Sequence, residues 1–303
     1  MRLPMNPNSH ASQVTFPTER LGLQTVAKSV EITPRLIQSA AAAVQETGER
    51  YFDDSRTSGL DVHPGLIFSL EWWTRFMPGR GTLPEEIGLR GVHAWTDIRL
   101  RQPFKLGDVI TSQGQLISIS TIPPGTLTVT RWTFSDAWGN IVAEYDKGGI
   151  VRDIFPDDKD QSINDRLPLP DASEGAAQSN WSKEIKITAN TAQIYSECAQ
   201  IYNPIHTEKQ VALSAGLPDT ILHGVCTQSL AIGAILEHIC DGDPKQLRRV
   251  YGQYRAMVLP NSTITIRVTS KELLDNNSTL IRYDVLTELG DKAIDNGIII
   301  IKT

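Results

Sequence analysis

The chain has 303 residues, of which 40% are hydrophobic and 21% charged, with 29 lysines and arginines against 35 aspartates and glutamates. This composition is typical of a globular protein and excludes wholesale disorder, and the length corresponds to about two domains. A net charge of −6 without a large basic cluster argues against a nucleic-acid or anionic-membrane surface.

Several other classes of protein are also disfavoured by the sequence. The cysteines Cys198, Cys226 and Cys240 are widely spaced, which indicates reduced thiols rather than disulfides. No apolar run approaches the ~20 residues that cross a bilayer, and no secretory signal precedes the first helix, so we expect a cytoplasmic protein without membrane contact. Metal-ligand spacings and nucleotide-binding glycine motifs do not occur, and we expect neither a metal nor a nucleotide cofactor.

The first half begins with a polar stretch, residues 1–20, that predicts a flexible leader. Residues 34–49 follow with the pattern of a helix, since Pro34 suits a first helical position. His63 precedes the apolar segment 66–73, and alternating strands come after it. Their turns are expected at Leu106-Gly107-Asp108 and Trp138-Gly139-Asn140.

The second half repeats this order after a charged, proline-containing linker over residues 156–180. Residues 191–198 are helical in pattern, an apolar helix is expected over 225–239, and hairpin strands follow. We therefore predict an α+β fold in which two helix-plus-antiparallel-sheet repeats, residues 21–155 and 181–303, lie side by side. Joining their sheets would cover two exposed edges.

The second half also contains a polar break in its helical pattern. Asn203-Pro204 interrupts the helix, because proline lacks a backbone donor. His206 follows the break, where a neutral imidazole can face a cavity and exchange protons. Thr207–Ala215 predicts a short helix after it. Gly224 precedes the later apolar helix, where its backbone N–H can polarise a substrate carbonyl.

Asn203-Pro204-Ile205-His206, followed by Leu222-His223-Gly224, resembles the signature of the MaoC-like dehydratases and type-2 (R)-specific enoyl-CoA hydratases. The resemblance implies a tandem (double) hotdog fold whose first repeat is degenerate. It also implies a hydro-lyase that acts on an α,β-unsaturated or β-hydroxy acyl thioester, with acyl-CoA as a possible substrate and no separate cofactor. His206 would be the acid/base, Asn203 an orienting group and Gly224 the carbonyl donor.

The sequence departs from the family pattern at one position that matters. The family's aspartate, two residues before the asparagine, is Ile201 here, and the preceding glycine is Gln200. A second proton carrier or pocket residue is then sought among Tyr195, Tyr202, Glu197, His223, Glu71, Asp219 and Glu208.

Two alternatives to the hydro-lyase stay open at this stage. One is a biosynthetic enzyme that dehydrates, isomerises or cyclises an intermediate not bound to CoA. The other is a catalytically inactive subunit that binds an acyl thioester or a partner. A homodimer is compatible with two repeats but is not required, because a tandem chain already forms the dimer-like sheet internally.

Overall fold

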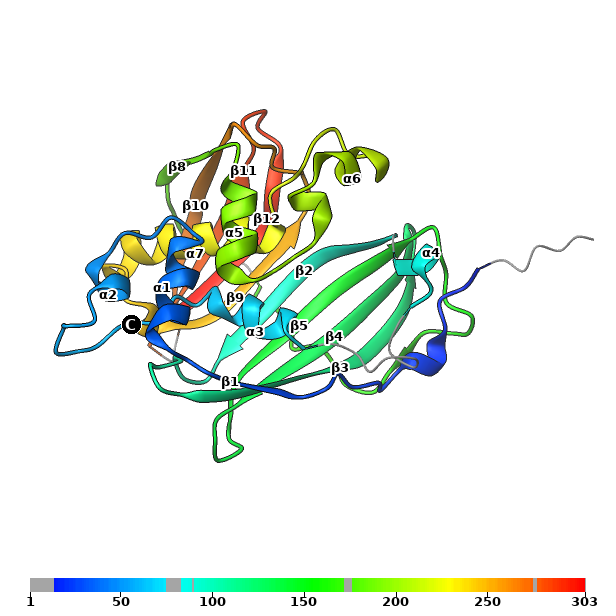
Figure 1. Ribbon diagram of the computed structural model, residues 1–303, viewed down its shortest axis with the longest axis horizontal. Coiled ribbons are helices and arrows are strands. Elements are labelled where there is room, and N and C mark those ends of the chain that lie inside the picture. Colours follow the sequence, from blue (N-terminus) through cyan, green and yellow to red (C-terminus); the bar gives the residue numbers. More distant parts are fainter. Residues whose placement is uncertain (1–13, 75–82, 89, 172–175, 275–276, 303) are drawn as a thin grey trace, which may run out of the picture.

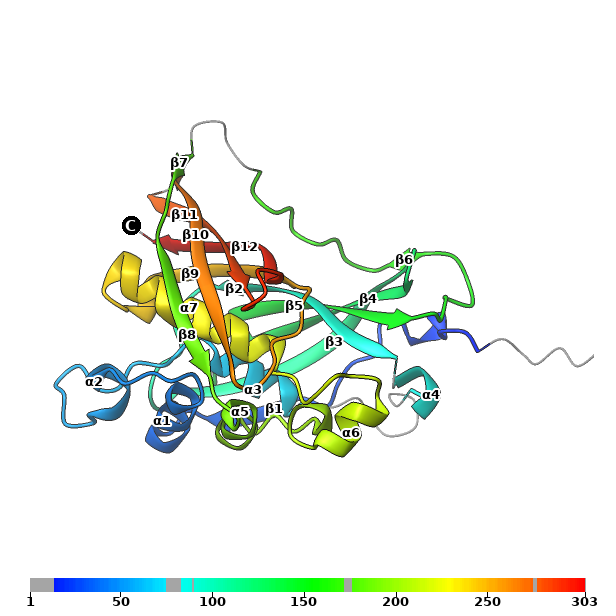
Figure 2. The ribbon, with the colours of Figure 1, turned by 90° about the horizontal axis from the view of Figure 1, so that it is seen from above.

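The computed structural model describes residues 14–74, 83–88, 90–171, 176–274 and 277–302, without the side chain of residue 85. Across these ranges, helices pack on one face of a single strongly curved antiparallel sheet (Figures 1 and 2). The strand order is β1-β3-β4-β5-β2-β9-β12-β11-β10-β7, with β6 paired to β3 and β8 paired to β10. The α+β class predicted from the sequence is confirmed.

The helices are α1 (Pro34–Ala42), α2 (Glu49–Phe52), α3 (Leu66–Trp72), α4 (Glu85–Gly88), α5 (Thr191–Ala199), α6 (Lys209–Ser214) and α7 (Gly224–Cys240), with 3₁₀ turns η1 (Thr18–Arg20), η2 (Pro204–His206) and η3 (Pro244–Gln246). The strands are β1 (Lys28–Glu31), β2 (Gly91–Leu100), β3 (Val109–Ile122), β4 (Gly125–Ser135), β5 (Ile141–Arg152), β6 (Gln161–Ser162), β7 (Ala177–Gln178), β8 (Ser182–Ile187), β9 (Leu247–Tyr254), β10 (Ser262–Leu274), β11 (Ser278–Leu286) and β12 (Lys292–Lys302).

The two halves of the sheet have the same internal order. Strands β3-β4-β5-β2 of the first repeat correspond to β10-β11-β12-β9 of the second. The halves meet where β2 pairs antiparallel with β9, over a register that begins at Trp95 opposite Gln253 and ends at Arg99 opposite Arg249. This central seam removes the two edges that separate repeats would expose.

The central helices of the repeats differ in length. In the second repeat α7 has 17 residues and lies along its sheet, whereas α3 in the first repeat has 7. Figure 1 shows α3 near one end of β2–β5 and α4 near the other. The shorter helix covers less of the concave face of the first sheet, and this is where the cavity described below opens.

The structure differs from the sequence prediction at the first helix. The expected helix over 34–49 ends at Ala42, because Gln45 adopts a left-handed backbone conformation with φ of 59°. The Glu46 N–H donates to the Ala41 carbonyl, which closes the helix end as a tight loop. A separate short helix, α2, then follows.

The described part of the predicted leader is also ordered. Phe16 is 2% exposed and packs with residues of the first repeat, and its N–H donates to the Phe155 carbonyl. The Phe16 ring thus anchors this part of the chain on the first repeat. The remainder of the predicted leader, 1–13, lies outside the described residues.

The predicted linker crosses the outer face of the sheet between β6 and β7 (Figure 2). Arginines of the sheet hold it by donating to its backbone carbonyls. Arg131 donates to Asp165, Arg249 to Pro168 and Arg282 to Pro170. The linker thus contacts strands of both repeats.

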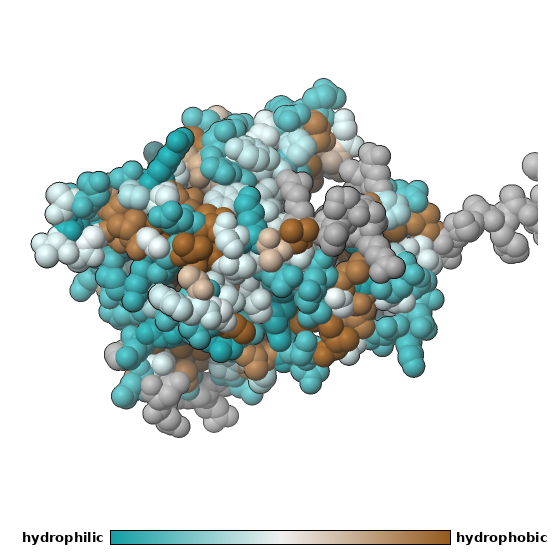
Figure 3. Space-filling view, turned by 60° about the horizontal axis from the view of Figure 1, so that its bottom comes forward, coloured by the Kyte–Doolittle hydropathy of each residue, from teal (hydrophilic) through white to brown (hydrophobic). Residues whose placement is uncertain are grey.

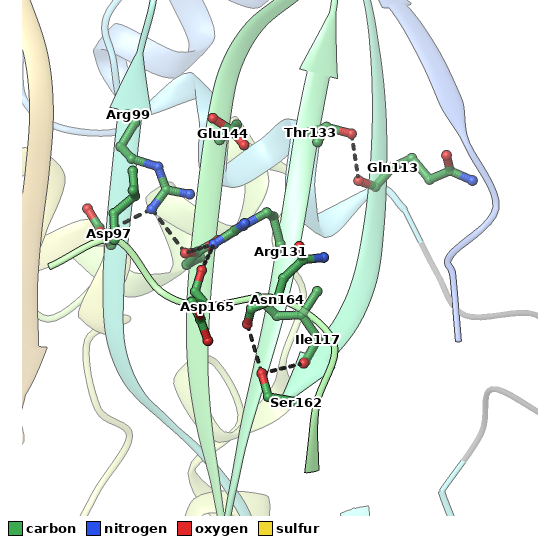
Figure 4. A network of polar contacts seen from close by, with 12 residues as sticks. Asp97, Arg99, Gln113, Ile117, Arg131, Thr133, Glu144, Ser162, Asn164 and Asp165 are labelled. Carbon is green, nitrogen blue, oxygen red and sulfur yellow. Dashed lines mark hydrogen bonds and ion pairs between the residues drawn. The ribbon is translucent and has the colours of Figure 1, made fainter. Parts of the chain in front are cut away.

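A buried ion-pair cluster lies beneath the linker, on strands β2, β4, β5 and β9 (Figure 4). Asp146 accepts two bonds from Arg131, at 2.7 and 2.8 Å, and one from Arg99 at 3.0 Å. Asp97 accepts from Arg99 and from Arg249 across the seam. We define these five residues as the seam cluster.

The face shown in Figure 3 is mostly hydrophilic and carries several separate apolar areas. Within the ranges that the structure describes, no helix has the length and apolar composition needed to cross a membrane.

Candidate active site

The loop that follows α5 positions the histidine predicted to be catalytic. Gln200 caps α5 with a left-handed φ of 55°, so the chain turns sharply out of the helix. The Asn203 side chain then caps η2 by accepting from the Ile205 N–H. Pro204 suits the first position of this turn. Asn203 therefore orients the turn on which His206 lies.

The His206 ring is held by one strong hydrogen bond. Its Nδ1 lies 2.8 Å from the Ile221 carbonyl oxygen. A carbonyl only accepts, so Nδ1 carries the hydrogen and Nε2 keeps a lone pair. Burial lowers the pKa of His206, while the bond to Ile221 acts in the opposite direction. The ring is thus a neutral base at neutral pH, with Nε2 available for proton transfer.

His223 supports His206 from one side. The two rings stack with their centroids 3.7 Å apart. Nε2 of His223 donates to the Ile201 carbonyl at 3.3 Å and contacts Ser196 Oγ at 3.2 Å. Burial first, and then the neighbouring His206, lower the pKa of His223 to about 2. His223 stays neutral and links the end of α5 to the start of α7.

Gly224 is the first residue of α7 and lines the same cavity as His206. The N–H of a first helical residue has no partner within the helix and lies at the positive end of the helix dipole. The Tyr254 ring packs closely here, since a Cβ at position 224 would be 3.0 Å from Tyr254 Cδ1. This arrangement leaves little room for a side chain at position 224.

A cavity of about 920 Å³ extends from this point into the first repeat. Its wall includes Ile201, Asn203, His206, His223 and Gly224, so the structure brings these five predicted residues together. The volume is in the range of small-molecule sites.

The other predicted residues lie elsewhere. Tyr195 is buried behind His223, with the ring centroids 4.9 Å apart, and Tyr202 is 55% exposed. Glu197 and Glu208 are exposed, and Asp219 pairs with Lys209. Of the candidate carboxylates, Glu71 alone is a wall residue, and it is the one Asp or Glu in the described wall.

Sequence reasoning missed three polar wall residues, or gave them another role. Tyr254 and Lys147 are not singled out by the sequence, and nothing near His93 in the sequence separates a site residue from a core residue. They lie on strands β9, β5 and β2, where only the alternation of side chains decides which face a residue occupies. No local motif marks them. In the described part of the chain, no cluster of three His, Cys, Asp or Glu side chains could hold a metal.

Gln200 offers a test of the local backbone. We expect Gln200→Gly to raise the free energy of unfolding by about 0.5–1 kcal/mol, because glycine adopts a left-handed conformation without the steric cost of a Cβ. Chemical denaturation measures the difference. Gln200→Ala, which keeps the Cβ, is the control, and equal stability of the two variants would contradict the expectation.

Parts of the chain are similar in sequence to known proteins. Residues 174–289 match the model of the MaoC like domain. A probable enoyl-CoA hydratase 2 of Dictyostelium discoideum is 31% identical over 157 residues, which are 51% of this chain and 48% of the relative. The chain thus spans about half of the length of this curated relative.

Solved structures share the fold over nearly the whole chain. A MaoC-like dehydratase from Phytophthora capsici has a TM-score of 0.79 at 18% identity, covering 94% of this chain and 98% of that one. A Mycobacterium tuberculosis protein described as a double hotdog has a TM-score of 0.61 at 14% identity, covering 93% and 96%. The tandem hotdog fold expected from the sequence is confirmed.

Proposed function

We propose that this chain, whose residues 174–289 match the MaoC like domain, is a hydro-lyase that adds water to, or removes it from, a carbon–carbon double bond conjugated to an acyl thioester. One observation carries the proposal. The neutral His206 ring, whose Nε2 keeps its lone pair, and the N-terminus of α7 both lie in the wall of one cavity of about 920 Å³.

The reaction needs a base and a hydrogen-bond donor to the thioester carbonyl. We assign these two roles to His206 and to the Gly224 N–H. Gly224 N–H donates to the thioester carbonyl oxygen and stabilises the enolate that forms there. In dehydration, His206 Nε2 removes the proton from Cα, and the C–O bond at Cβ breaks. The imidazolium then gives that proton to the departing hydroxide, so that water leaves. Hydration follows the same path in reverse.

His206 is the single proton carrier in this proposal. Ile201, where the family has its aspartate, is 5% exposed and contributes only a hydrocarbon side chain to the wall. Glu71 is already paired with Lys147 at 3.0 Å. A single histidine suffices where the proton taken from one carbon is returned to the adjacent leaving group on the same face.

The proposal is tested by following the absorbance of the conjugated thioester with crotonyl-CoA and longer trans-2-enoyl-CoAs. We expect turnover by the wild type and a rise in kcat of about 10²-fold in Ile201→Asp, which supplies the family's second carrier. The control is Ile201→Asn, because asparagine has nearly the shape of aspartate but no charge. We expect the kcat of this variant to stay near that of the wild type.

The outcome separates the alternatives. A silent wild type with an active Ile201→Asp variant would mean that the scaffold is intact but its chemistry serves another substrate, as in a biosynthetic dehydratase, isomerase or cyclase. Silence from both would favour an inactive acyl-thioester-binding subunit. The cytoplasmic location and a homodimer stay predictions.

A further inference from the structure

The cavity contains a second polar region at its first-repeat end. On β5, Asp146 belongs to the seam cluster on the outer face, so the next residue, Lys147, points to the concave face. Its Nζ lies 3.0 Å from Glu71 Oε1 and over the Trp132 ring at 5.7 Å. Glu71 comes from the last turn of the shortened helix α3. An ion pair between the buried Glu71 and the half-buried Lys147 thus lies on the wall where an acyl chain would run.

A β-bulge adds a histidine to this region. Along β2, Trp95 packs with residues of the outer face, and simple alternation would place His93 on that face too. The register with β5 shifts between His93 and Trp95, and His93 contacts the Tyr145 hydroxyl at 3.3 Å and lines the cavity. Bulges are a common way to redirect a side chain towards a site. Burial, and then Lys147, keep the pKa of His93 well below its usual value, so the ring is neutral.

The polar region is continuous with the reaction site through Tyr254. One side of this ring packs against Gly224, and its centroid lies 4.7 Å from that of His93. The hydroxyl of Tyr254 donates to Gln228. A thioester with its carbonyl at Gly224 would therefore extend past Tyr254 to His93, Glu71 and Lys147.

We propose that Lys147, Glu71 and His93 form a subsite for a neutral oxygen substituent, a hydroxyl or a ketone, on the acyl chain of the substrate. This inference rests on the proposed function. Lys147 can donate to such an oxygen and Glu71 can accept from a hydroxyl, while the His93 ring, held by the Tyr145 hydroxyl, forms the polar wall beside them. The opposite charges of Glu71 and Lys147 cancel, so the subsite disfavours a carboxylate, which would have to compete with Glu71. A plain alkyl chain would exclude water from the Glu71–Lys147 pair and would satisfy none of the hydrogen-bonding capacity that this pair leaves unused.

The test compares trans-2-hexenoyl-, trans-2-octenoyl- and trans-2-decenoyl-CoA with their ω-hydroxy and ω-carboxy counterparts. At one chain length or more, we expect the wild type to have a kcat/KM about 10- to 100-fold higher for the hydroxylated substrate than for the alkyl one, as for a hydrogen bond to a charged group. The kcat/KM for the ω-carboxy substrate should not exceed that for the alkyl substrate. A higher kcat/KM for the alkyl chain at every length would overturn the subsite.

A double variant, Glu71→Gln with Lys147→Met, removes both charges together, because removing one alone would leave a buried charge unpaired. We expect the hydroxyl-to-alkyl ratio to fall to within about 3-fold of unity. The control, Lys292→Met with Asp295→Asn, removes an exposed ion pair on β12 and should keep the wild-type ratio. A ratio that the first double variant leaves unchanged would also overturn the subsite.

Failure of the subsite and failure of the proposed function can be distinguished. If no thioester is turned over, the hydro-lyase proposal fails, and calorimetry with decanoyl-CoA and 10-hydroxydecanoyl-CoA then tests the subsite alone. Tighter binding of the hydroxylated ester by the wild type, lost in the double variant, would support it. Equal binding would overturn it.

Discussion

Replacing His206 by alanine is expected to lower kcat/KM for trans-2-enoyl-CoA hydration by at least about 10³-fold. General acid–base catalysis by one group contributes about 10²- to 10⁴-fold, and here the same imidazole handles both proton transfers. Ile201, in the described wall, is a buried hydrocarbon side chain and cannot share the proton transfers. Steady-state kinetics measure the loss.

The control for this variant is His238→Ala. His238 is an exposed histidine near the far end of α7, stacked on Trp181, and its removal should leave kcat/KM unchanged. Binding of decanoyl-CoA to His206→Ala shows that the cavity is intact. A His206→Ala enzyme that keeps more than about a tenth of the wild-type rate would contradict the role of His206 as the proton carrier.

The pH dependence of the wild type provides a further prediction. Burial lowers the pKa of His206 below the ordinary histidine value of 6.5. Only the neutral ring acts as a base, so hydration activity should be fully present above this lowered pKa. Activity should be lost as the pH falls through it, at a midpoint below 6.5. A midpoint of kcat/KM above 7 would contradict the assignment.

The second large effect is expected at the seam cluster. We expect Asp146→Ala to lower the free energy of unfolding by about 3–5 kcal/mol, the loss that is typical when one partner of a buried ion pair is removed. The Asp146 side chain is 1% exposed, and its removal would leave the half-buried Arg131 without the carboxylate that it pairs with, while Arg99 keeps Asp97. Chemical denaturation measures the change. Glu144→Ala, which breaks an ion pair with the exposed Arg101, should cost less than about 1 kcal/mol.

The same carboxylate gives a stability difference that depends on pH. Burial alone would raise the pKa of Asp146, but hydrogen bonds from Arg131 and Arg99 outweigh it and lower the pKa in the folded state. The stabilisation is therefore complete above the unfolded value of about 3.9 and lost as the pH falls through the folded value. The difference in the free energy of unfolding between the wild type and Asp146→Ala should therefore become smaller only at acidic pH. A gap that narrows between pH 8 and 6 would contradict this assignment.

The features that the sequence predicted well have strong local signals. The apolar run after Gly224 forms α7, and the Asn203-Pro204 break gives the turn that carries His206, because proline and an asparagine cap act within a few residues. The turns at Gly107 and Gly139 have positive φ values of 84° and 85°, as their glycines indicate.

The features that escaped prediction depend on distant contacts. The end of α1 at Ala42 is set by a left-handed residue that is not glycine, Gln45. His93 faces the cavity only because of a register shift against β5. The pairing of Glu71 with Lys147 joins residues 76 positions apart, on a helix and a strand. Alternation and propensity fix none of these, since each is decided by tertiary packing.

The linker over the outer face of the sheet has a consequence for assembly. Arg166 lies over the Trp95 ring at 3.7 Å, and neighbouring linker carbonyls accept from Arg131, Arg249 and Arg282. The chain thus covers the aromatic and charged centre of this face with its own backbone. A second copy could not stack its sheet directly here without first displacing that segment and its hydrogen bonds. Any association between copies would therefore use another surface of the molecule.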